Sequence, residues 1–401
     1  MADESKSSST SMLNQPIVID VGSHNIKAGF AGGTKPKVVI GSRVGTAKHL
    51  RIMPGGSLEG LEHLSSGKHS SSVASYFIGK TLDDHRGAFL LHHPLHRGQV
   101  ANGGWDAMEL LLEHVYDKQN LNAKVEEHPL LLTEPPLNCT KHRQEMASLV
   151  FESFRSPALF LAPPAVLSLY ASGRTTGIVL DVGHGLTHCI PVYEGYALPH
   201  SIVRSDLGGM DVDDRLKLLL RKGGLAFETT AEFEFCTKMK EEICYINPSN
   251  KTADAGANTA IAKAQYQLPD GQVIDISNER TAPEILFDPS IIGSEASSVQ
   301  DVLLSSIDKS DLELRSTLYS NIVLSGGTTK TPGFGDRLLY EVRSRAPERT
   351  RIRISAPPER EHSAWVGGSI LASLSTFKNM WVTKESYEEE GPDRVLFKGS
   401  L

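Results

Sequence analysis

Residues 17–30 constrain the fold most, because they predict a β-hairpin with a polar tip. The stretch reads I-V-I-D-V-G-S-H-N-I-K-A-G-F: an apolar run into Asp20, a short turn and an alternating return strand. Gly22 lets the backbone approach a ligand, Ser23 offers a hydroxyl, and the N–H groups of the turn can form an anion-binding nest. Lys27 adds a point charge, and Asp20 can hold a hydrated Mg²⁺ through its water shell. Together these groups indicate a phosphate clamp.

A second stretch, residues 177–193, repeats this pattern. It reads G-I-V-L-D-V-G-H-G-L-T-H-C-I-P-V-Y, and its Asp-Val-Gly begins at Asp181 as the first begins at Asp20. The repeat predicts two related halves. Two such hairpins facing across a cleft would hold one polyphosphate from both sides.

Composition narrows the class of protein. The chain has 401 residues, enough for one large or two medium domains, and a net charge of -7, which argues against nucleic-acid binding. The four cysteines lack metal-ligand spacing and are expected to be free thiols of a reducing cytosol. Residues 1–13 are expected to form a disordered tail, and no apolar run is long enough for membrane insertion.

Strands and helices are expected to alternate, which indicates an α/β sheet core in each half. Strands are expected at residues 130–134, 158–161 and near Val323. Helices are expected from Trp105, at 143–154, 164–172, 212–222 and 230–246, and after Gly333. Asp106 with Glu109 predicts a capping box for the first helix.

Three further motifs differ in strength. Ser325-Gly326-Gly327-Thr328 follows an apolar strand and precedes a helix, a junction that suits an anion or a ribose and purine edge. Residues 74–81 nearly spell a P-loop but lack its first glycine, so a P-loop is the weaker interpretation. Residues 92–96 carry three histidines around Pro94, and a solvated loop explains them better than a metal site.

Four stretches carry a resemblance to a known family. Residues 360–382 read R-E-H-S-A-W-V-G-G-S-I-L-A-S-L-S-T-F-K-N-M-W-V, and the others are residues 167–177, 194–200 and 324–329. These stretches resemble actin sequences, and the resemblance runs from about Asn14 to Trp381, which is nearly the whole chain. The resemblance implies an actin-like α/β fold: duplicated ribonuclease-H-like domains around a nucleotide cleft, in four subdomains. The implied small domain spans 14–171 and 363–401, with a loop-bearing subdomain at 42–93. The implied large domain spans 172–362, with an inserted subdomain at 208–295.

Several stretches are more similar to centractins, the actin relatives that form the short filament of the dynactin complex. Among them are N-Q-P-I-V-I-D at 14–20, the A-Q-Y-x-L-P-D-G core within 263–276, and K-S-D-L-E-L-R at 309–315. This resemblance implies a cytoplasmic, cytoskeletal subunit of a head-to-tail filament. Its implied partners are other dynactin subunits, dynein and its adaptors, and capping protein.

The resemblance also implies roles for individual residues. Asp20 and Asp181 would organise the hydrated metal of bound ATP or ADP with Mg²⁺, and His188 matches a family histidine near the attacking water. The phosphates would lie at Gly22, Ser23, Lys27 and Gly183. The ribose and adenine would lie at Gly209, Lys240, Glu241, Gly326, Gly327 and Thr328.

Departures from the family pattern put catalysis in doubt. Pro164 stands where the family has its water-positioning glutamine, and proline has neither a side-chain amide nor an N–H. His184 replaces a second aspartate, and His24 and Asn25 change the first turn. Thr331 and Glu361 change the adenine site. These changes predict weak or lost ATP hydrolysis, with nucleotide retention left open.

Functions from three classes remain open at this point. A structural filament protein would use the loop at 54–75, or leave it as a plain insertion, and an apolar inter-subunit plug at 285–292. An enzyme would be a conventional or lineage-specific actin-like ATPase outside dynactin, or a sugar kinase, which needs a general base for its acceptor. A chaperone ATPase would need a separate peptide-binding domain.

Overall fold

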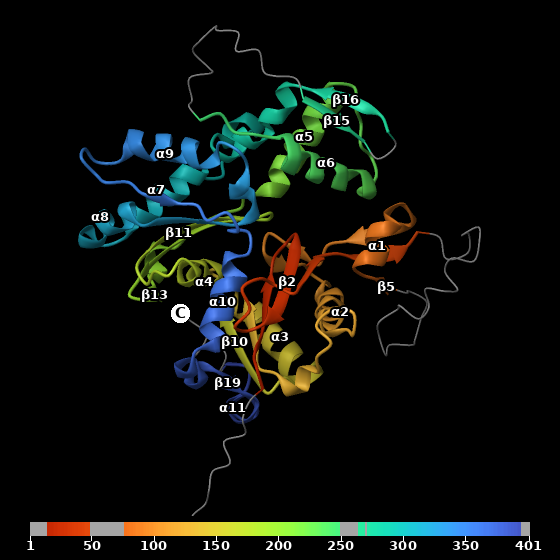
Figure 1. Ribbon diagram of the computed structural model, residues 1–401, viewed down its shortest axis with the longest axis vertical. Helices are drawn as coiled ribbons and strands as arrows, with labels where there is room; N and C mark the ends of the chain where they lie inside the picture. Colours follow the sequence, from red (N-terminus) through yellow and green to blue (C-terminus); the bar gives the residue numbers. More distant parts are fainter. Residues whose placement is uncertain (1–13, 49–75, 249–263, 269–270, 394–401) are drawn as a thin grey trace, which may run out of the picture.

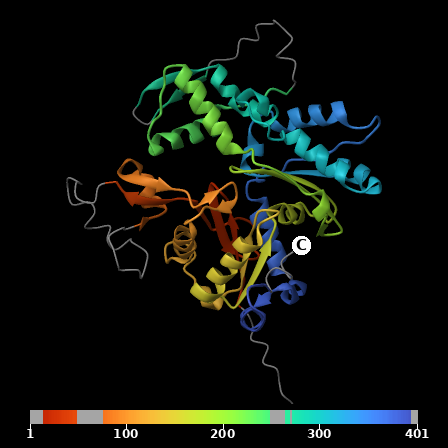
Figure 2. The ribbon, with the colours of Figure 1, turned by 180° about the vertical axis from the view of Figure 1, so that it is seen from behind.

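The computed structural model describes residues 14–48, 76–248, 264–268 and 271–393, which form two halves built around two six-stranded sheets. The tail at 1–13 and the loop at 54–75 therefore lie outside the described residues. In Figure 1 the first sheet and its helices fill the lower part of the molecule, and the second sheet with α5 to α9 fills the upper part. Figure 2 shows the same division from behind.

The first sheet has the order β19-β10-β9-β1-β2-β3. Its strands are β1 (Ile17–Val21), β2 (Asn25–Phe30), β3 (Val38–Gly41), β9 (Leu130–Thr133), β10 (Ala158–Ala162) and β19 (Val382–Thr383). β1 and β2 form the expected antiparallel hairpin, and β9 and β10 continue the sheet in parallel. One face packs on α2 (Trp105–Tyr116) and α3 (Thr140–Ser148), and the other packs on α10 (Ser363–Ser373).

The second sheet repeats this arrangement, with the order β13-β12-β11-β17-β18 and β14 beside β12. Its strands are β11 (Gly177–Val182), β12 (Thr187–Tyr193), β13 (Tyr196–Ala197), β14 (Val203–Ser205), β17 (Ile322–Ser325) and β18 (Ile354–Ser355). Again a hairpin of two antiparallel strands is continued by two parallel strands. We call the first sheet, with the helices that pack on it, the first half. We call the second sheet, with the helices that cover it, the second half.

Helices cover both faces of the second sheet. α4 (Pro164–Ala171) packs on one face, where Val166 and Leu169 meet Val179 and Ile190. Five helices cover the other face: α5 (Gly209–Lys222), α6 (Thr230–Ile243), α7 (Val299–Lys309), α8 (Leu312–Ser320) and α9 (Phe334–Arg345). β15 (Ala264–Gln267) and β16 (Val273–Ile276) form a separate hairpin beside α6.

A small lobe of the first half lies between β3 and α2. It contains β4 (Val44–Ala47), β5 (Tyr76–Phe77), α1 (Lys80–Asp84) and β6 (Phe89–His92), followed by the short pair β7 (Leu95–His96) and β8 (Gln99–Val100). In Figure 1 this lobe reaches toward α6 of the second half. The described part of the segment that resembles a P-loop, residues 76–81, contains β5 and the first two residues of the five-residue helix α1.

The expected elements are present, with differences at their ends. The prediction of a capping box with Asp106 as N-cap and Glu109 as its partner is wrong. The N-cap of α2 is Gly104, which makes no side-chain hydrogen bond. The helix expected at 143–154 begins at Thr140 and ends in a π-helical turn, Leu149–Ser153. α5 begins three residues before the expected Val212, and α6 ends at Ile243.

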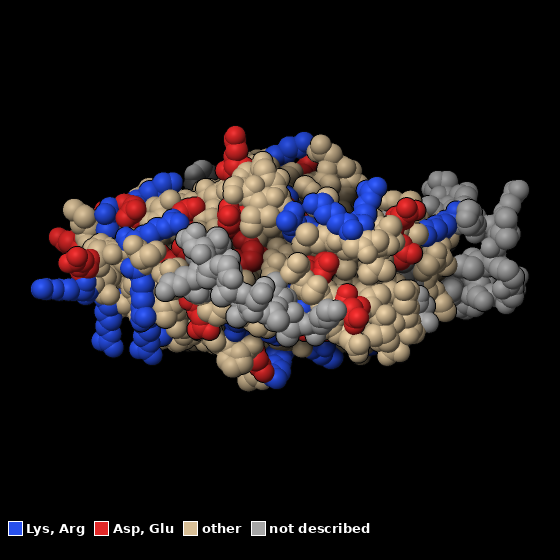
Figure 3. Space-filling model, turned by 90° about the horizontal axis from the view of Figure 1, so that it is seen from above, with Lys and Arg blue, Asp and Glu red and all other residues tan. Residues whose placement is uncertain are grey.

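The surface of the described residues is mixed in charge. In Figure 3 acidic and basic side chains are interspersed over the face seen from above, and basic ones gather toward one end. That end lies on the side of α9, which is followed by exposed Arg349, Arg351 and Arg353. None of the described helices has the length and apolar character that crossing a bilayer requires.

Candidate functional site

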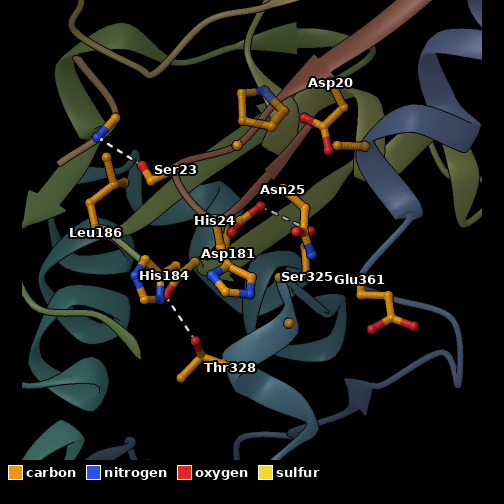
Figure 4. A pocket seen from close by; sticks show the side chains of 18 of the residues that line it. Asp20, Ser23, His24, Asn25, Asp181, His184, Leu186, Ser325, Thr328 and Glu361 are labelled. Carbon is orange, nitrogen blue, oxygen red and sulfur yellow. Dashed lines mark hydrogen bonds between the residues drawn. The ribbon is translucent and has the colours of Figure 1, made fainter. Parts of the chain in front are cut away.

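A cavity of about 520 Å³ lies between the tips of the two hairpins. It gathers nearly all of the residues that the sequence singled out as a site. These are Asp20, Gly22, Ser23, Lys27, Pro164, Asp181, Gly183, His188, Lys240, Glu241, Gly326, Gly327 and Thr328. Asp20 and Asp181 face this one space from opposite halves (Figure 4).

Gly209 lies just outside the lining. Its carbonyl accepts a hydrogen bond from Lys240 Nζ at 3.1 Å, and a Cβ atom placed on it would lie 2.8 Å from Thr328 Oγ1. Gly209 therefore supports two lining residues from behind, and its absent side chain allows their close approach.

Asp20 is held at the end of β1 by two neighbours. Its Oδ1 accepts a hydrogen bond from Thr133 Oγ1 at 2.9 Å, and its Oδ2 pairs with Lys27 Nζ at 2.9 Å. Thr133 ends β9, the parallel neighbour of β1, and its hydroxyl oxygen also accepts a bond from the N–H of Val21. The Asp20 side chain is 9% exposed, so both hydrogen bonds form where little water competes with them.

Asp181 has an equivalent arrangement in the second half. Its Oδ2 accepts a hydrogen bond from Ser325 Oγ at 2.9 Å, and Ser325 ends β17, the parallel neighbour of β11. Ser325 Oγ lies 2.9 Å from Ser168 Oγ, which donates to the carbonyl of Pro164. In each half, a hydroxyl at the end of the next parallel strand thus orients the aspartate.

The residue opposite each aspartate differs between the halves. Lys27 stands opposite Asp20 across the first hairpin, and His188 stands opposite Asp181 across the second. His188 is buried, and neither ring nitrogen has a hydrogen-bond partner among the described residues. Burial lowers the pKa of His188 more than nearby Asp181 raises it, so the ring is neutral at pH 7.

Two more histidines meet between the hairpin tips, His24 from the first and His184 from the second (Figure 4). Their ring centroids lie 4.9 Å apart. Burial, and then the charge of Lys240, lower the pKa of His24 to about 4 and that of His184 to about 2. Neither ring therefore contributes a positive charge at neutral pH.

Glycines give the lining its close backbone approach. A Cβ atom on Gly22 would lie 2.7 Å from the carbonyl oxygen of Asn25, so only glycine closes this turn without strain. Gly326 has φ +87°, and a Cβ atom there would lie 2.3 Å from the carbonyl oxygen of Val182. Within the described residues, the backbone N–H groups of Ser23 and His184 make no hydrogen bond, which leaves them available to an anion.

The far end of the cavity is polar. Lys330 Nζ lies 2.9 Å from Glu361 Oε1, and both residues line the cavity together with Glu241 and Thr331. Lys240 Nζ lies 3.0 Å from Asp213 Oδ2. Burial raises the pKa of Glu241, although Lys240 opposes that shift.

These features fit a nucleotide that carries its own metal. The described lining has five carboxylates, Asp20, Glu134, Asp181, Glu241 and Glu361, against three lysines, Lys27, Lys240 and Lys330. A bare polyphosphate would meet a net negative lining, whereas Mg²⁺ neutralises phosphate charge and prefers carboxylate and water oxygens. Asp20 and Asp181 would hold the hydrated ion, and the orphaned nitrogens of buried His188 suit a further polar group.

Other histidine-rich and glycine-rich motifs lie elsewhere. Of the residues 92–96, none lines the cavity. The described residues contain no group of three or more His, Cys, Asp or Glu side chains that could hold a metal ion. Lys80 and Thr81 of the segment that resembles a P-loop are not part of the lining either. Residues 92–96 do not form one loop as expected, because His92 ends β6 and Leu95 and His96 form β7.

Sequence reasoning missed several residues that organise the site. Thr133 could have been found, because it ends a buried apolar strand next to that of Asp20. Arg97 and Asp211 are different. They form a bidentate ion pair between a turn of the first half and the start of α5. No local sequence pattern predicts a contact between residues so far apart in the chain.

Comparisons with known proteins agree with this architecture. The family model described as actin matches residues 12–400. An actin-like protein of Neurospora crassa is 49% identical over 394 residues, which cover 97% of this chain and 99% of that protein. The duplicated α/β fold expected from the sequence is confirmed, and the chain belongs to the actin family.

Proposed function

We propose that this chain is a filament-forming structural subunit that holds ATP or ADP with Mg²⁺ mainly to fix the relative position of its halves. The observation that carries the proposal is the contrast within one cavity. Both aspartates keep their orienting hydroxyls, while Pro164 occupies the wall where actins have a water-positioning glutamine. Binding is therefore expected to persist where hydrolysis is weak.

The roles of the site residues follow from the contacts. Asp20 and Asp181 would hold the hydrated metal. Lys27 and the N–H groups of Ser23 and His184, which are unbonded within the described residues, would contact phosphates, which Gly22 and Gly183 allow to approach the backbone closely. Gly326, Gly327 and Thr328, backed by Gly209, would contact the ribose, with Lys240 and Glu241 near the base. His188, buried beside Asp181, would contact the water at the terminal phosphate, which no glutamine orients.

Self-association is supported by exposed apolar side chains. Ile291 and Ile292, which lie in the expected plug segment, are 42% and 39% exposed. Actin-like proteins generally form filaments, and a head-to-tail contact between identical subunits propagates without closing. We propose this segment as part of that contact.

The centractin-like stretches favour one filament in particular. We propose that the chain is a subunit of the dynactin complex, in contact with further dynactin subunits and capping protein, and through them with dynein and its adaptors. The place of action would be the cytoplasmic cytoskeleton, without nucleic acid and without membrane insertion. Affinity purification of the complex from its native cells is the test: dynactin subunits are expected, and recovery with chromatin remodellers instead would overturn the assignment.

The nucleotide part of the proposal needs the purified full-length chain. Acid extraction and chromatography should recover about one nucleotide per chain, and single-turnover assays with Mg-ATP should show slower hydrolysis than a conventional actin measured in parallel. Sedimentation and electron microscopy should show short filaments. Hydrolysis at the rate of the conventional actin would instead favour the second candidate, an actin-like ATPase filament protein outside dynactin.

A further inference from the structure

Two ion pairs join the halves of the molecule across the candidate site. Arg97, in the turn between β7 and β8 of the first half, pairs with Asp211 of α5 in the second half. Arg43, between β3 and β4 of the first half, contacts Asp83 of α1 in its own half. It also pairs with Glu234 of α6 in the second half. We propose that these pairs form a clamp that keeps the cleft closed whether or not nucleotide is bound, so that bound nucleotide exchanges slowly.

The Arg97 pair has the geometry of a specific contact. Nη1 lies 2.6 Å from Asp211 Oδ2, and Nη2 lies 2.7 Å from Asp211 Oδ1, so both prongs of the guanidinium are used. The side chains are 22% and 14% exposed, which limits screening by salt. Asp211 also accepts the N–H of Gly208, which fixes the carboxylate at the start of α5.

The same turn reaches both hairpin tips. Arg97 Nη1 donates to the carbonyl of Gly185 in the second tip at 3.1 Å, and the N–H of Gly98 donates to Ser23 Oγ in the first tip at 3.1 Å. A Cβ atom on Gly98 would lie 2.5 Å from Leu186 Cδ2, so the turn is in tight contact with the second hairpin. Arg97 is therefore a positioning residue that sets the spacing of the two tips.

The backbone of this turn supports the same conclusion. Arg97 has φ +51°, a conformation that non-glycine residues adopt when their surroundings hold them there. Arg204 Nη2, from the second half, donates to the carbonyl of Arg97 at 3.0 Å. The turn is thus held through its side chain and its backbone.

The second pair lies farther along the interface, where α1 reaches toward α6 (Figure 1). Arg43 is 9% exposed, and its Nη1 lies 2.6 Å from Glu234 Oε1. Its other nitrogen contacts Asp83 of its own half, so the guanidinium is anchored on one side and bridges to the other. Buried ion pairs add little net stability, but they fix a relative position, because breaking one leaves an uncompensated charge.

The expected slow exchange of nucleotide rests on the proposed function, because it requires that the cavity binds ATP or ADP. The closed arrangement of the two halves does not depend on it. The experiment therefore has two readouts on the full chain: small-angle X-ray scattering without nucleotide, and dissociation of a fluorescent N-methylanthraniloyl-ADP with Mg²⁺. The variants are Arg97→Gln, Arg43→Gln and their combination. Arg345→Gln is the matched control, because Arg345 pairs with Asp301 inside the second half.

We expect the native chain and Arg345→Gln to give one compact scattering profile without nucleotide, and the double variant to give a larger radius of gyration. Dissociation of the fluorescent nucleotide should be about tenfold faster in the double variant, as when one partner of a buried charge pair is removed. Arg97→Lys keeps the positive charge but cannot form the bidentate contact. Its rate of nucleotide dissociation should lie between that of the native chain and that of Arg97→Gln.

The outcomes separate the two ideas. A double variant that folds and keeps both the native scattering profile and the native dissociation rate overturns the clamp. If the native chain binds no nucleotide, the proposed function fails, and the scattering comparison still decides whether the pairs hold the halves closed. If the double variant fails to fold, the single variants carry the same comparison.

Discussion

The imidazole ring of His24 lies 4.9 Å from that of His184, centroid to centroid, in the gap between the two hairpin tips. Their pKa values, about 4 and about 2, lie below the ordinary 6.5, with burial as the main cause. As pH falls from 6.5 to 4, the unfolded chain takes up protons before the folded chain does. We expect the free energy of unfolding to decrease over that range, by at most about 1.4 kcal/mol per pH unit for each histidine.

Urea unfolding at pH 7 and pH 4.5 measures this dependence. The double variant His24→Asn/His184→Asn should lose less stability on acidification than the native chain. Replacement of exposed His96 by Asn serves as the control and should keep the native dependence. An equal loss in the free energy of unfolding between pH 7 and pH 4.5 in the native chain and the double variant would contradict the prediction.

Pro164→Gln should increase ATP hydrolysis. Pro164 is the first residue of α4 and lines the cavity, and a residue at this position needs no intrahelical N–H bond, so the helix tolerates glutamine. A side-chain amide there can orient water, which should raise the single-turnover rate roughly 10- to 100-fold. Pro163→Gln is the matched control, because Pro163 is not among the lining residues. An unchanged rate for Pro164→Gln would show that water orientation is not what limits hydrolysis.

Lys27→Met should destabilise the nucleotide-free chain. It leaves the buried carboxylate of Asp20 with Thr133 as its remaining hydrogen-bond donor, at a cost of about 3 kcal/mol in urea unfolding. The exposed pair of Lys35 with Glu359 offers the comparison, since Lys35→Met should leave stability unchanged. A result in which both variants unfold like the native chain would mean that Asp20 is solvated in solution.

Gly326→Ala and the neighbouring Gly327→Ala should behave differently. At Gly326 the positive φ and the nearby carbonyl of Val182 leave no room for a methyl group, so we expect a loss of about 3 kcal/mol or more. At Gly327 the added Cβ meets no atom within 4 Å apart from its chain neighbours and the backbone of its own helical turn, and stability should stay within about 0.5 kcal/mol of native. Thermal unfolding compares the two, and similar losses would contradict the prediction.

Nucleotide affinity should depend on a divalent metal. Because carboxylates outnumber lysines in the described lining and its histidines His24, His184, His188 and His362 have pKa values lowered from 6.5, which leaves them neutral at pH 7, removal of Mg²⁺ by EDTA should weaken ATP binding by about tenfold or more. Isothermal titration before and after addition of excess Mg²⁺ measures the change. Affinity that is unaffected by EDTA would contradict a metal role for Asp20 and Asp181.

The sequence predicted the parts of the site that local patterns encode. The two Asp-Val-Gly turns and the Gly326-Gly327 junction each follow an apolar strand. β11 and β17 are parallel neighbours in the second sheet, which brings the ends that carry Asp181 and the glycine pair together. Asp20 belongs to the first sheet, and it lines the same cavity as Asp181 from the other half, as two hairpins that face across a cleft would.

The remaining contacts come from tertiary structure. Arg97 with Asp211, and Arg43 with Glu234, join positions far apart in the chain, and single charged residues on turns and helices look like solvated surface in a sequence. The capping box expected of Asp106 and Glu109 failed for a different reason. α2 begins at Trp105, so its N-cap is Gly104, which has no side chain to accept an N–H.

The C-terminal segment has a consequence for synthesis on the ribosome. β19 completes the edge of the first sheet, and Trp365 of α10 donates a hydrogen bond from its indole to the carbonyl of Val18. Gly367 lies so close to Leu167 that a methyl group would overlap its carbonyl. The first half therefore cannot complete its core until α10 and β19 have been synthesised, and the nascent chain must stay protected from aggregation until these two elements emerge.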